Sequence, residues 1–256
     1  MLYDITLIAI GFALVAKGGD LFVDSSIQIG RALRIPRFVI GGTLVSLATT
    51  MPELVVSVTA STMGDSGIAL GNAIGSCICN IGLIVGIVAM ITPVSVDRAS
   101  FAGRANWMLI GGILVILFCW DLTMSRTLGS VLLGLAGAYL IWDYLAIRAI
   151  RQMQVKGEEH GGDALPLGAV GWFLCVAVLI IIGSRFLVTS GQSVAVALGV
   201  PSAIIGFSVI AIGTSVPELV TGVSAARKGV PDLSLGNIIG ANALNLLLIV
   251  GLSGTI

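Results

Sequence analysis

Two glutamates, Glu53 and Glu218, lie within apolar stretches of this chain that are long enough to cross a membrane. The surrounding residues read SLATTMPELVVS at positions 46–57 and AIGTSVPELVTG at positions 211–222. Each glutamate directly follows a proline and lies close to hydroxyl side chains. An ionisable group at this depth costs roughly 3 kcal/mol on insertion. Its appearance twice, in the same setting, predicts a functional site that uses both carboxylates.

Helical spacing places the polar residues of each stretch on one face. In the first stretch the steps between polar positions are 3, 1, 3 and 4 residues, and the second stretch repeats these steps with fewer polar groups. The span after each stretch carries another polar stripe, with a period of four residues. The two sets of positions are Ser46, Thr49, Thr50, Glu53, Ser57, Asn72, Ser76 and Asn80, and Ala211, Thr214, Ser215, Glu218, Gly222, Asn237, Ala241 and Asn245.

The candidate ligands in these stripes are all oxygen atoms. Pro52 and Pro217 lack the N–H group that would bond to the carbonyls of Ala48 and Gly213, so these two carbonyls are further candidates. Carboxylate, hydroxyl, amide and carbonyl oxygens suit Ca²⁺ and Na⁺, and no soft ligand for a transition metal is present. Two ionised glutamates would give a formal charge of −2. One Ca²⁺ neutralises that charge and several Na⁺ could offset it, so competition between these occupancies is a physical basis for exchange.

The composition predicts a protein that lives in a membrane. Charged residues make up 10% of the 256 positions and hydrophobic residues 57%, whereas a soluble domain has about 25% charged residues. Apolar runs near the ~20 residues needed to span a bilayer recur along most of the chain. We therefore expect an all-α polytopic membrane protein. The formal net charge is zero, so no basic surface predicts nucleic-acid binding.

We predict about eight transmembrane helices, at residues 3–30, 38–62, 67–91, 105–120, 127–148, 167–197, 203–226 and 232–254. Residues 1–150 form a first half with five spans, 151–165 a hydrophilic connection, and 166–256 a second half with three spans. Of the 13 lysines and arginines, ten lie in connections after odd-numbered spans. The positive-inside rule therefore predicts a multi-pass protein of the cell (plasma or inner) membrane, with the N-terminus outside and the 151–165 connection in the cytoplasm.

The two halves contain a sequence repeat. Shifting residues 36–91 by 165 positions places them on residues 201–256 without a gap, and 22 of the 56 positions are identical. Five predicted spans separate equivalent points, so the two copies enter the membrane from opposite sides. This is the inverted-topology repeat of secondary transporters, whose site lies near the midplane between copies. The same shift aligns Asp20 with Arg185, and we interpret Lys17, Asp20 and Asp24 as structural or vestibule residues.

Both copies resemble the motifs of the cation/calcium antiporter superfamily, in its sodium/calcium exchanger branch of the prokaryotic type. The resemblance rests on TTMPE at residues 49–53 and TSVPE at 214–218, each followed by a Gly-Asn pair and a further asparagine eight residues later. It implies alternating-access exchange of Na⁺ for Ca²⁺ at clustered sites. The family pattern has ten helices, so the resemblance also implies that two C-terminal spans are missing from this chain.

The resemblance also implies roles for individual residues. The residues that resemble the Ca²⁺ ligands are Glu53, Glu218, Thr49 and Thr214. Those that resemble the cytoplasm-side Na⁺ site are Ser46, Thr49, Glu53 and Ser76. Those that resemble the outer Na⁺ site are Ala211, Thr214, Glu218 and the position of Ala241. The asparagines that would flank the centre are Asn80 and Asn245. With the stripe hydroxyls, the predicted ion-binding set is Ser46, Thr49, Thr50, Glu53, Ser76, Asn80, Ala211, Thr214, Ser215, Glu218 and Asn245.

Two other functions stay open. A H⁺/Ca²⁺ antiporter is possible because either glutamate could titrate, and a cation channel could be built from the same ligands. We do not expect an enzyme, because the only histidine, His160, lies in the hydrophilic connection. We expect no cofactor, Na⁺ and Ca²⁺ as the transported ions, the lipid bilayer as partner, and no need for an oligomer.

Ala241 has no hydroxyl where the family pattern offers a serine. We expect Ala241→Ser to change the Na⁺ dependence of transport more than the affinity for Ca²⁺, because serine adds an oxygen ligand at the outer Na⁺ site. The check is ion flux in proteoliposomes, measured against the concentration of each ion. Identical Na⁺ response curves for the variant and the parent would count against this placement of the outer site.

Overall fold

The computed structural model describes residues 2–64, 66–120, 125–155, 167–199 and 211–256, and these contain helices and no strand. The α-helices and the π-helical segments η are α1 (Leu2–Leu33), α2 (Arg37–Ile40), η1 (Gly41–Val45), α3 (Ser46–Thr49), α4 (Met51–Thr62), α5 (Ser66–Ile78), η2 (Cys79–Ile84), α6 (Val85–Ile91), α7 (Arg98–Phe118), α8 (Arg126–Val155), α9 (Leu167–Ala197), α11 (Ala211–Thr214), α12 (Val216–Arg227), α13 (Pro231–Leu244), η4 (Asn245–Ile249) and α14 (Val250–Thr255).

The predicted class, an all-α polytopic membrane protein, is confirmed. Six helices among the described residues are long and apolar enough to cross a membrane, and the bent pair Arg37–Thr49 and Met51–Thr62 forms a further candidate span. The predicted span 203–226 begins within residues 200–210, which lie outside the described part, and continues as α11 and α12. Residues 156–166 of the predicted connection also lie outside it. The count of eight spans and the inverted repeat stay predictions.

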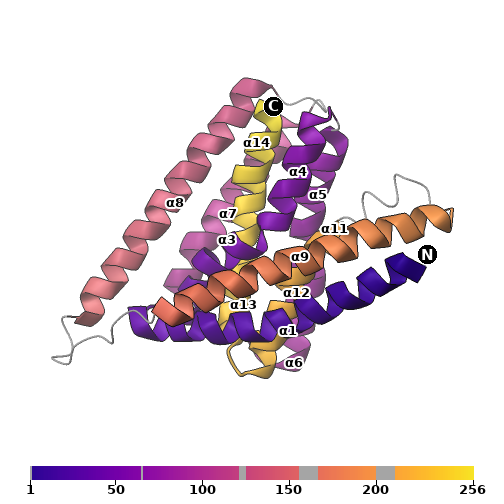
Figure 1. The fold of residues 1–256 in the computed structure, drawn as a ribbon. Coiled ribbons are helices and arrows are strands. Elements are labelled where there is room, and N and C mark those ends of the chain that lie inside the picture. The colour runs from indigo at the N-terminus through magenta and orange to yellow at the C-terminus, as the bar shows by residue number, and fades with distance from the viewer. Residues whose placement is uncertain (1, 65, 121–124, 156–166, 200–210) are drawn as a thin grey trace.

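The two longest helices, α1 and α9, pack against each other and cross the remaining helices obliquely (Figure 1). Glycine lets their backbones touch, because a Cβ at Gly11 would lie 2.7 Å from the carbonyl oxygen of Gly183. The rings of Phe22 and Phe173 stack between the same helices with centroids 4.5 Å apart. A tightly packed pair of helices therefore lies across the bundle that holds both predicted glutamates.

The last helical segment lies at the centre of the bundle. In the stretch Pro231–Thr255, 78% of the most apolar window is buried, far more than in the other candidate spans. Its first part, α13, crosses α2 and η1 at glycines. A Cβ at Gly236 would lie 2.0 Å from the carbonyl oxygen of Phe38, and one at Gly41 would lie 2.1 Å from that of Leu233. Backbone contact at this crossing brings polar side chains from the two halves of the chain within reach of each other.

One predicted boundary is wrong. The predicted span 105–120 left Arg104 in a connection, but α7 begins at Arg98 and buries this arginine. The sequence signal for the earlier start is an N-cap: the carboxylate of Asp97 accepts a hydrogen bond of 2.8 Å from the backbone N–H of Ser100. The hydrogen bonds from Ser100 hold the pKa of Asp97 below its usual value. Because the cap lies seven residues before it, Arg104 falls two turns inside the helix.

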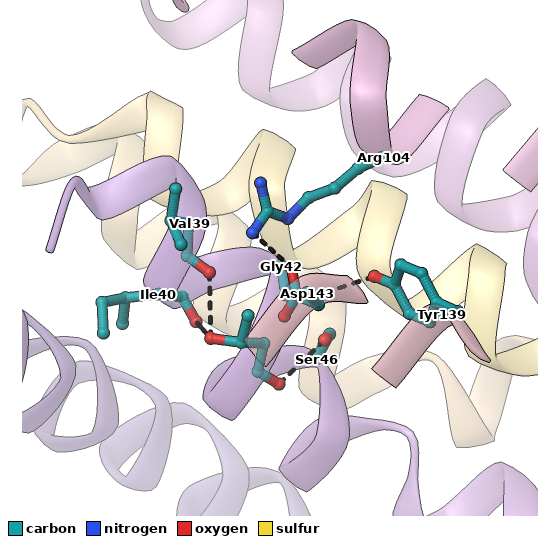
Figure 2. A network of polar contacts seen from close by, with 8 residues as sticks. Val39, Ile40, Gly42, Ser46, Arg104, Tyr139 and Asp143 are labelled. Atoms are coloured by element: carbon teal, nitrogen blue, oxygen red, sulfur yellow. Dashed lines mark hydrogen bonds and ion pairs between the residues drawn. The ribbon is translucent and has the colours of Figure 1, made fainter. Parts of the chain in front are cut away.

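Arg104 forms a buried ion pair with Asp143 of α8, shown in Figure 2. Its guanidinium also lies 5.7 Å from the ring centre of Phe38 and 5.8 Å from that of Trp142, in cation–π contact. One turn before Asp143, the hydroxyl of Tyr139 donates a hydrogen bond of 3.4 Å to the carbonyl of Gly42. These contacts fasten α7 and α8 to the η1 segment that precedes Ser46.

Removal of one member of this ion pair is expected to destabilise the fold. Asp143→Asn would leave the buried guanidinium without a counter-charge and should lower the free energy of unfolding by about 3–5 kcal/mol. The double variant Arg104→Met/Asp143→Leu, which buries no charge, should lose less. The measurement is thermal unfolding of the purified protein in detergent. Tyr139→Phe is the control, because it removes a single hydrogen bond worth about 1 kcal/mol. A stability of Asp143→Asn equal to that of the parent would contradict this view of the pair.

Candidate cation-binding site

Both glutamates lie just after a break in a helix. Thr50 separates α3 from α4, and Ser215 separates α11 from α12. Their backbone angles are nearly equal: φ is −78° and ψ is −4° at Thr50, and φ is −84° and ψ is 4° at Ser215. The break in the first copy bends the span by 43°. Pro52 and Pro217 occupy the first turn of the following helix, where a missing N–H is tolerated. The carboxylates are thereby placed near the positive ends of two helix dipoles.

Proline frees two carbonyls, as the sequence indicates, but one of them already has a partner. The hydroxyl of Ser184 in α9 donates a hydrogen bond of 3.2 Å to the carbonyl of Gly213. This contact uses one of the two lone pairs of the Gly213 carbonyl and leaves the other available. It also attaches α9 directly to the residue before Thr214, so the long crossing helix and the helix break are in contact.

The glutamates themselves are buried and close to the opposite half of the chain. Glu53 is 0% exposed and Glu218 is 1% exposed. The hydroxyl of Ser215 donates a hydrogen bond of 3.3 Å to one carboxylate oxygen of Glu53. The second carboxylate oxygen of Glu53 and both carboxylate oxygens of Glu218 have no hydrogen-bond partner. The two acids are therefore held in the protein interior with most of their hydrogen-bonding capacity unused.

A matched pair of hydrogen bonds joins the two halves. Thr49 donates to the amide oxygen of Asn237 over 3.1 Å, and Thr214 donates to the amide oxygen of Asn72 over 3.0 Å. The 165-residue shift relates one bond to the other. Because each threonine hydroxyl donates its hydrogen to an asparagine, its oxygen can act only as an acceptor or a ligand toward other groups. Asn72 and Asn237, which the sequence placed on the polar stripes but not among the ligands, thus orient the threonines.

The supports of these two asparagines differ. The amide nitrogen of Asn72 donates to the hydroxyl of Ser57 over 2.9 Å and to the carbonyl of Glu53 over 3.2 Å. The amide nitrogen of Asn237 donates to the hydroxyl of Thr221 over 3.4 Å. Gly222 occupies the position equivalent to Ser57 and has no hydroxyl, so the neighbouring Thr221 takes over the contact. The first copy is therefore the more firmly hydrogen-bonded of the two.

Asn80 and Asn245 lie where the helix widens to π geometry, in η2 and at the start of η4. Such π turns are frequent at functional sites. The amide nitrogen of Asn80 donates a 2.9 Å hydrogen bond to the side chain of Asn242, which in turn donates to the carbonyl of Cys77 over 3.4 Å. This arrangement leaves the amide oxygen of Asn80 without a partner. Sequence reasoning missed Asn242, although it lies three residues before Asn245 and so on a similar helix face.

Six buried oxygens of the predicted residues have no hydrogen-bond partner, and we call them the unpaired group. A buried polar atom without a partner costs about 1–3 kcal/mol, so several in one place indicate a ligand that completes them. All of them are hard oxygen ligands of the kind that Ca²⁺ and Na⁺ bind. These atoms are Thr50 Oγ1, Glu53 Oε2, Asn80 Oδ1, Glu218 Oε1, Glu218 Oε2 and Asn245 Oδ1.

The remaining predicted residues lie at the edges of this group. Ser76 and Thr214 have their hydroxyl oxygens 3.4 Å apart. The hydroxyl of Ser46 donates to the carbonyl of Thr43 over 3.0 Å and so points back along its own helix (Figure 2). Ala241 is fully buried. Ala211 begins α11, and its side chain lies outside the described part of the structure.

A cavity of about 580 Å³ extends to Thr214, one of the predicted ligands. It lies between α4 and α9, and its wall includes Pro52, Thr214 and Arg185. On the other side α1 contacts α12: the hydroxyl of Ser224 donates to the carboxylate of Asp20 over 2.5 Å. Lys228, just after α12, also pairs with Asp24 at 2.7 Å. The α4–α9 cavity thus ends at Thr214 on one side, whereas polar contacts join α1 to α12 on the other.

Comparison with known proteins places this geometry in a family. The profile described as sodium/calcium exchanger protein matches residues 3–145 and 168–256. An uncharacterized membrane protein of Methanocaldococcus jannaschii is 34% identical, over 93% of this chain and 76% of that protein. The sodium/calcium exchanger MaX1 of Methanosarcina acetivorans is 32% identical, over 97% of this chain and 81% of that protein. The inner membrane protein YrbG of Escherichia coli is 32% identical, over 100% and 81%.

Solved structures agree with the sequence relatives. The sodium-calcium exchanger NCX_Mj, soaked with 2.5 mM Na⁺ and 10 mM Sr²⁺, superposes with a TM-score of 0.84 at 30% identity. The match covers 99% of this chain and 82% of that chain. The same exchanger soaked with 2.5 mM Na⁺ and 0.1 mM Ca²⁺ also gives a TM-score of 0.84.

Proposed function

This chain belongs to the sodium/calcium exchanger family, and from that premise we propose that it is a secondary active antiporter that exchanges Na⁺ for Ca²⁺. The proposed site lies between the two halves of the chain, with Glu53 and Glu218 at its centre. Threonine, serine and asparagine oxygens from both halves complete it. The membership also means that the chain is a multi-pass membrane protein of a transporter family and not of an enzyme family.

The observation that carries the proposal is the set of unpaired buried oxygens on both glutamates. Ca²⁺ takes six to eight oxygen ligands at about 2.3–2.6 Å, and the site offers two carboxylates beside neutral amide and hydroxyl oxygens. One Ca²⁺ neutralises both carboxylates, and two or more Na⁺ ions do the same. Because the same oxygens serve either ion, Na⁺ and Ca²⁺ compete for the site. Exchange follows if the site holds either Ca²⁺ or Na⁺, but not both, at one time.

Alternating access is supported by the unequal surroundings of the site. The cavity between α4 and α9 leads to Thr214, whereas Asp20 and Asp24 of α1 are held to Ser224 and Lys228. Under the predicted orientation the cavity opens to the outside. We propose that α1 and α9 move together as one packed pair, because their glycine contacts fasten them to each other. Such a movement would close the α4–α9 cavity and separate α1 from α12.

The first test is Ca²⁺ uptake by the purified protein in proteoliposomes. We expect uptake of ⁴⁵Ca²⁺ into vesicles loaded with Na⁺, and none when Na⁺ is replaced by choline, because efflux of Na⁺ must drive the exchange. A pH gradient should have no effect. Uptake that follows a pH gradient without Na⁺ would select a H⁺/Ca²⁺ antiporter, in which the unpaired carboxylates take up protons. Flow of Ca²⁺ down its own gradient without a counter-ion would select a channel.

Substitution of either acid is expected to abolish Ca²⁺ transport. Glu53→Gln and Glu218→Gln each keep the shape of the side chain but leave a single carboxylate, which cannot neutralise a divalent ion. Flux should fall to background while the amount of protein in the membrane stays the same. The matched control is Asp97→Asn, because Asp97 is an exposed N-cap and asparagine caps a helix equally well. Parental flux in either glutamine variant would rule out the assigned site.

A further inference from the structure

One arginine lies in the wall of the cavity that leads to the proposed site. Arg185 belongs to the membrane-spanning part of α9, Leu167–Gly191, and its side chain is exposed. Its carbonyl accepts a hydrogen bond from Thr189, but its guanidinium forms no ion pair among the described residues. An arginine in the hydrocarbon region is costly and usually pairs with an acid or lines a water-filled cavity. Arg185 lines a cavity.

This positive charge lies close to the proposed ligands. The neighbouring residue, Ser184, donates its hydroxyl hydrogen to the carbonyl of Gly213, directly before Thr214. Ser184, Arg185 and Thr214 all contribute to the wall of the same cavity. A cation that enters between α4 and α9 therefore passes a guanidinium that has no ion-pair partner among the described residues.

The equivalent position in the first half carries the opposite charge. The 165-residue shift places Arg185 on Asp20 of α1. The carboxylate of Asp20 accepts a hydrogen bond of 2.5 Å from Ser224. Lys228 donates to the carbonyl of Asp20 over 2.6 Å and pairs with Asp24 at 2.7 Å. Both acids on the α1 side therefore have polar partners, whereas the guanidinium of Arg185 on the α9 side has no ion-pair partner among the described residues.

We propose that Arg185 is a fixed charge that weakens the binding of Ca²⁺ from the cavity side more than that of Na⁺. The proposal rests on the exchange function proposed above. The Coulomb energy between Arg185 and an ion is proportional to the charge of the ion, so a divalent ion is repelled twice as strongly as a monovalent one. Apolar cavity walls concentrate the field of such a charge. Arg185 is thus a specificity-determining residue on the access path.

The consequence is an exchanger with unequal faces. Arg185 lowers the apparent affinity for Ca²⁺ at the face where the cavity opens, and the position that the repeat relates to it in the other half is the acid Asp20. Under the predicted orientation, Ca²⁺ is taken up more readily from the cytoplasm and released more readily outside. The driving force is unchanged, because the ion gradients alone determine it.

Equilibrium binding to the purified full chain in detergent tests the charge effect. We expect Arg185→Gln to lower the Kd for ⁴⁵Ca²⁺ about tenfold and the inhibition constant of a single Na⁺ about threefold, since the logarithm of each shift scales with ion charge. Arg185→Lys, which keeps the charge, should bind as the parent does. Arg148→Gln is the matched control, because it removes an exposed arginine of α8 that is not in the cavity wall.

The other outcomes would contradict either the charge effect of Arg185 or the proposed site itself. Unchanged binding in Arg185→Gln, or equal shifts for Ca²⁺ and Na⁺, would exclude a charge effect of Arg185 while leaving the exchange function intact. A similar shift in Arg148→Gln would show that any lost positive charge suffices. Failure of the parent to bind more Ca²⁺ than Glu218→Gln would overturn the proposed site, and the role of Arg185 with it.

Transport from each face tests the access path. Right-side-out and inverted membrane vesicles that contain the parent or Arg185→Gln present opposite faces to the medium. We expect the variant to lower the external Ca²⁺ concentration for half-maximal exchange in right-side-out vesicles and to leave it within about twofold in inverted ones, because a charge acts mainly within a Debye length of ~10 Å. Equal shifts at both faces, or a shift in inverted vesicles alone, would contradict the path.

Discussion

The structure depends on placing two buried carboxylates, Glu53 and Glu218, together in a membrane protein without a fixed counter-charge beside them. Neither acid forms an ion pair among the described residues, and three of their four oxygens have no hydrogen-bond partner. Burial of charge is costly unless something neutralises it. Under the proposed function the transported ion supplies this compensation. The strain of an incomplete site is therefore what makes binding of a cation favourable, and the surrounding helices serve to keep the carboxylates in place.

The helices do so by breaking and by close approach. Interruptions at Thr50 and Ser215 place each acid in the first turn of a new helix. Asn80 and Asn245 lie instead in π-helical turns within a continuous helix. Glycine contacts between α13 and η1 let polar side chains bond across the two halves. The threonines give their hydrogens to asparagines and so face the site with lone pairs. Few of these hydrogen bonds are strong, but together they fix the side chains whose remaining oxygens have no partner.

Arg104 and Arg185 both lie inside membrane-spanning helices, and the protein uses them differently. Arg104 is neutralised by Asp143 and held between the rings of Phe38 and Trp142, so its charge acts locally and fastens α7 and α8 to η1. Arg185 has no acidic partner among the described residues and lies in a cavity wall, so its field extends to whatever ion enters. The buried, paired charge of Arg104 therefore holds helices together, whereas the exposed charge of Arg185 can influence the binding of ions, as proposed above.

The sequence by itself determined the class of the protein and the positions of most helices, and it predicted the residues of the proposed site. These follow from local patterns: apolar runs, polar stripes at helical spacing, and two proline–glutamate motifs related by a constant shift. Only the tertiary structure decided that Asn72, Asn237 and Asn242 orient the ligands, and that Ser184 occupies the carbonyl of Gly213. It also decided that Arg104 has an acidic partner whereas Arg185 has none in the described part of the chain. Those outcomes depend on which atoms meet across helices distant in sequence, and spacing along one helix carries no information about its neighbours.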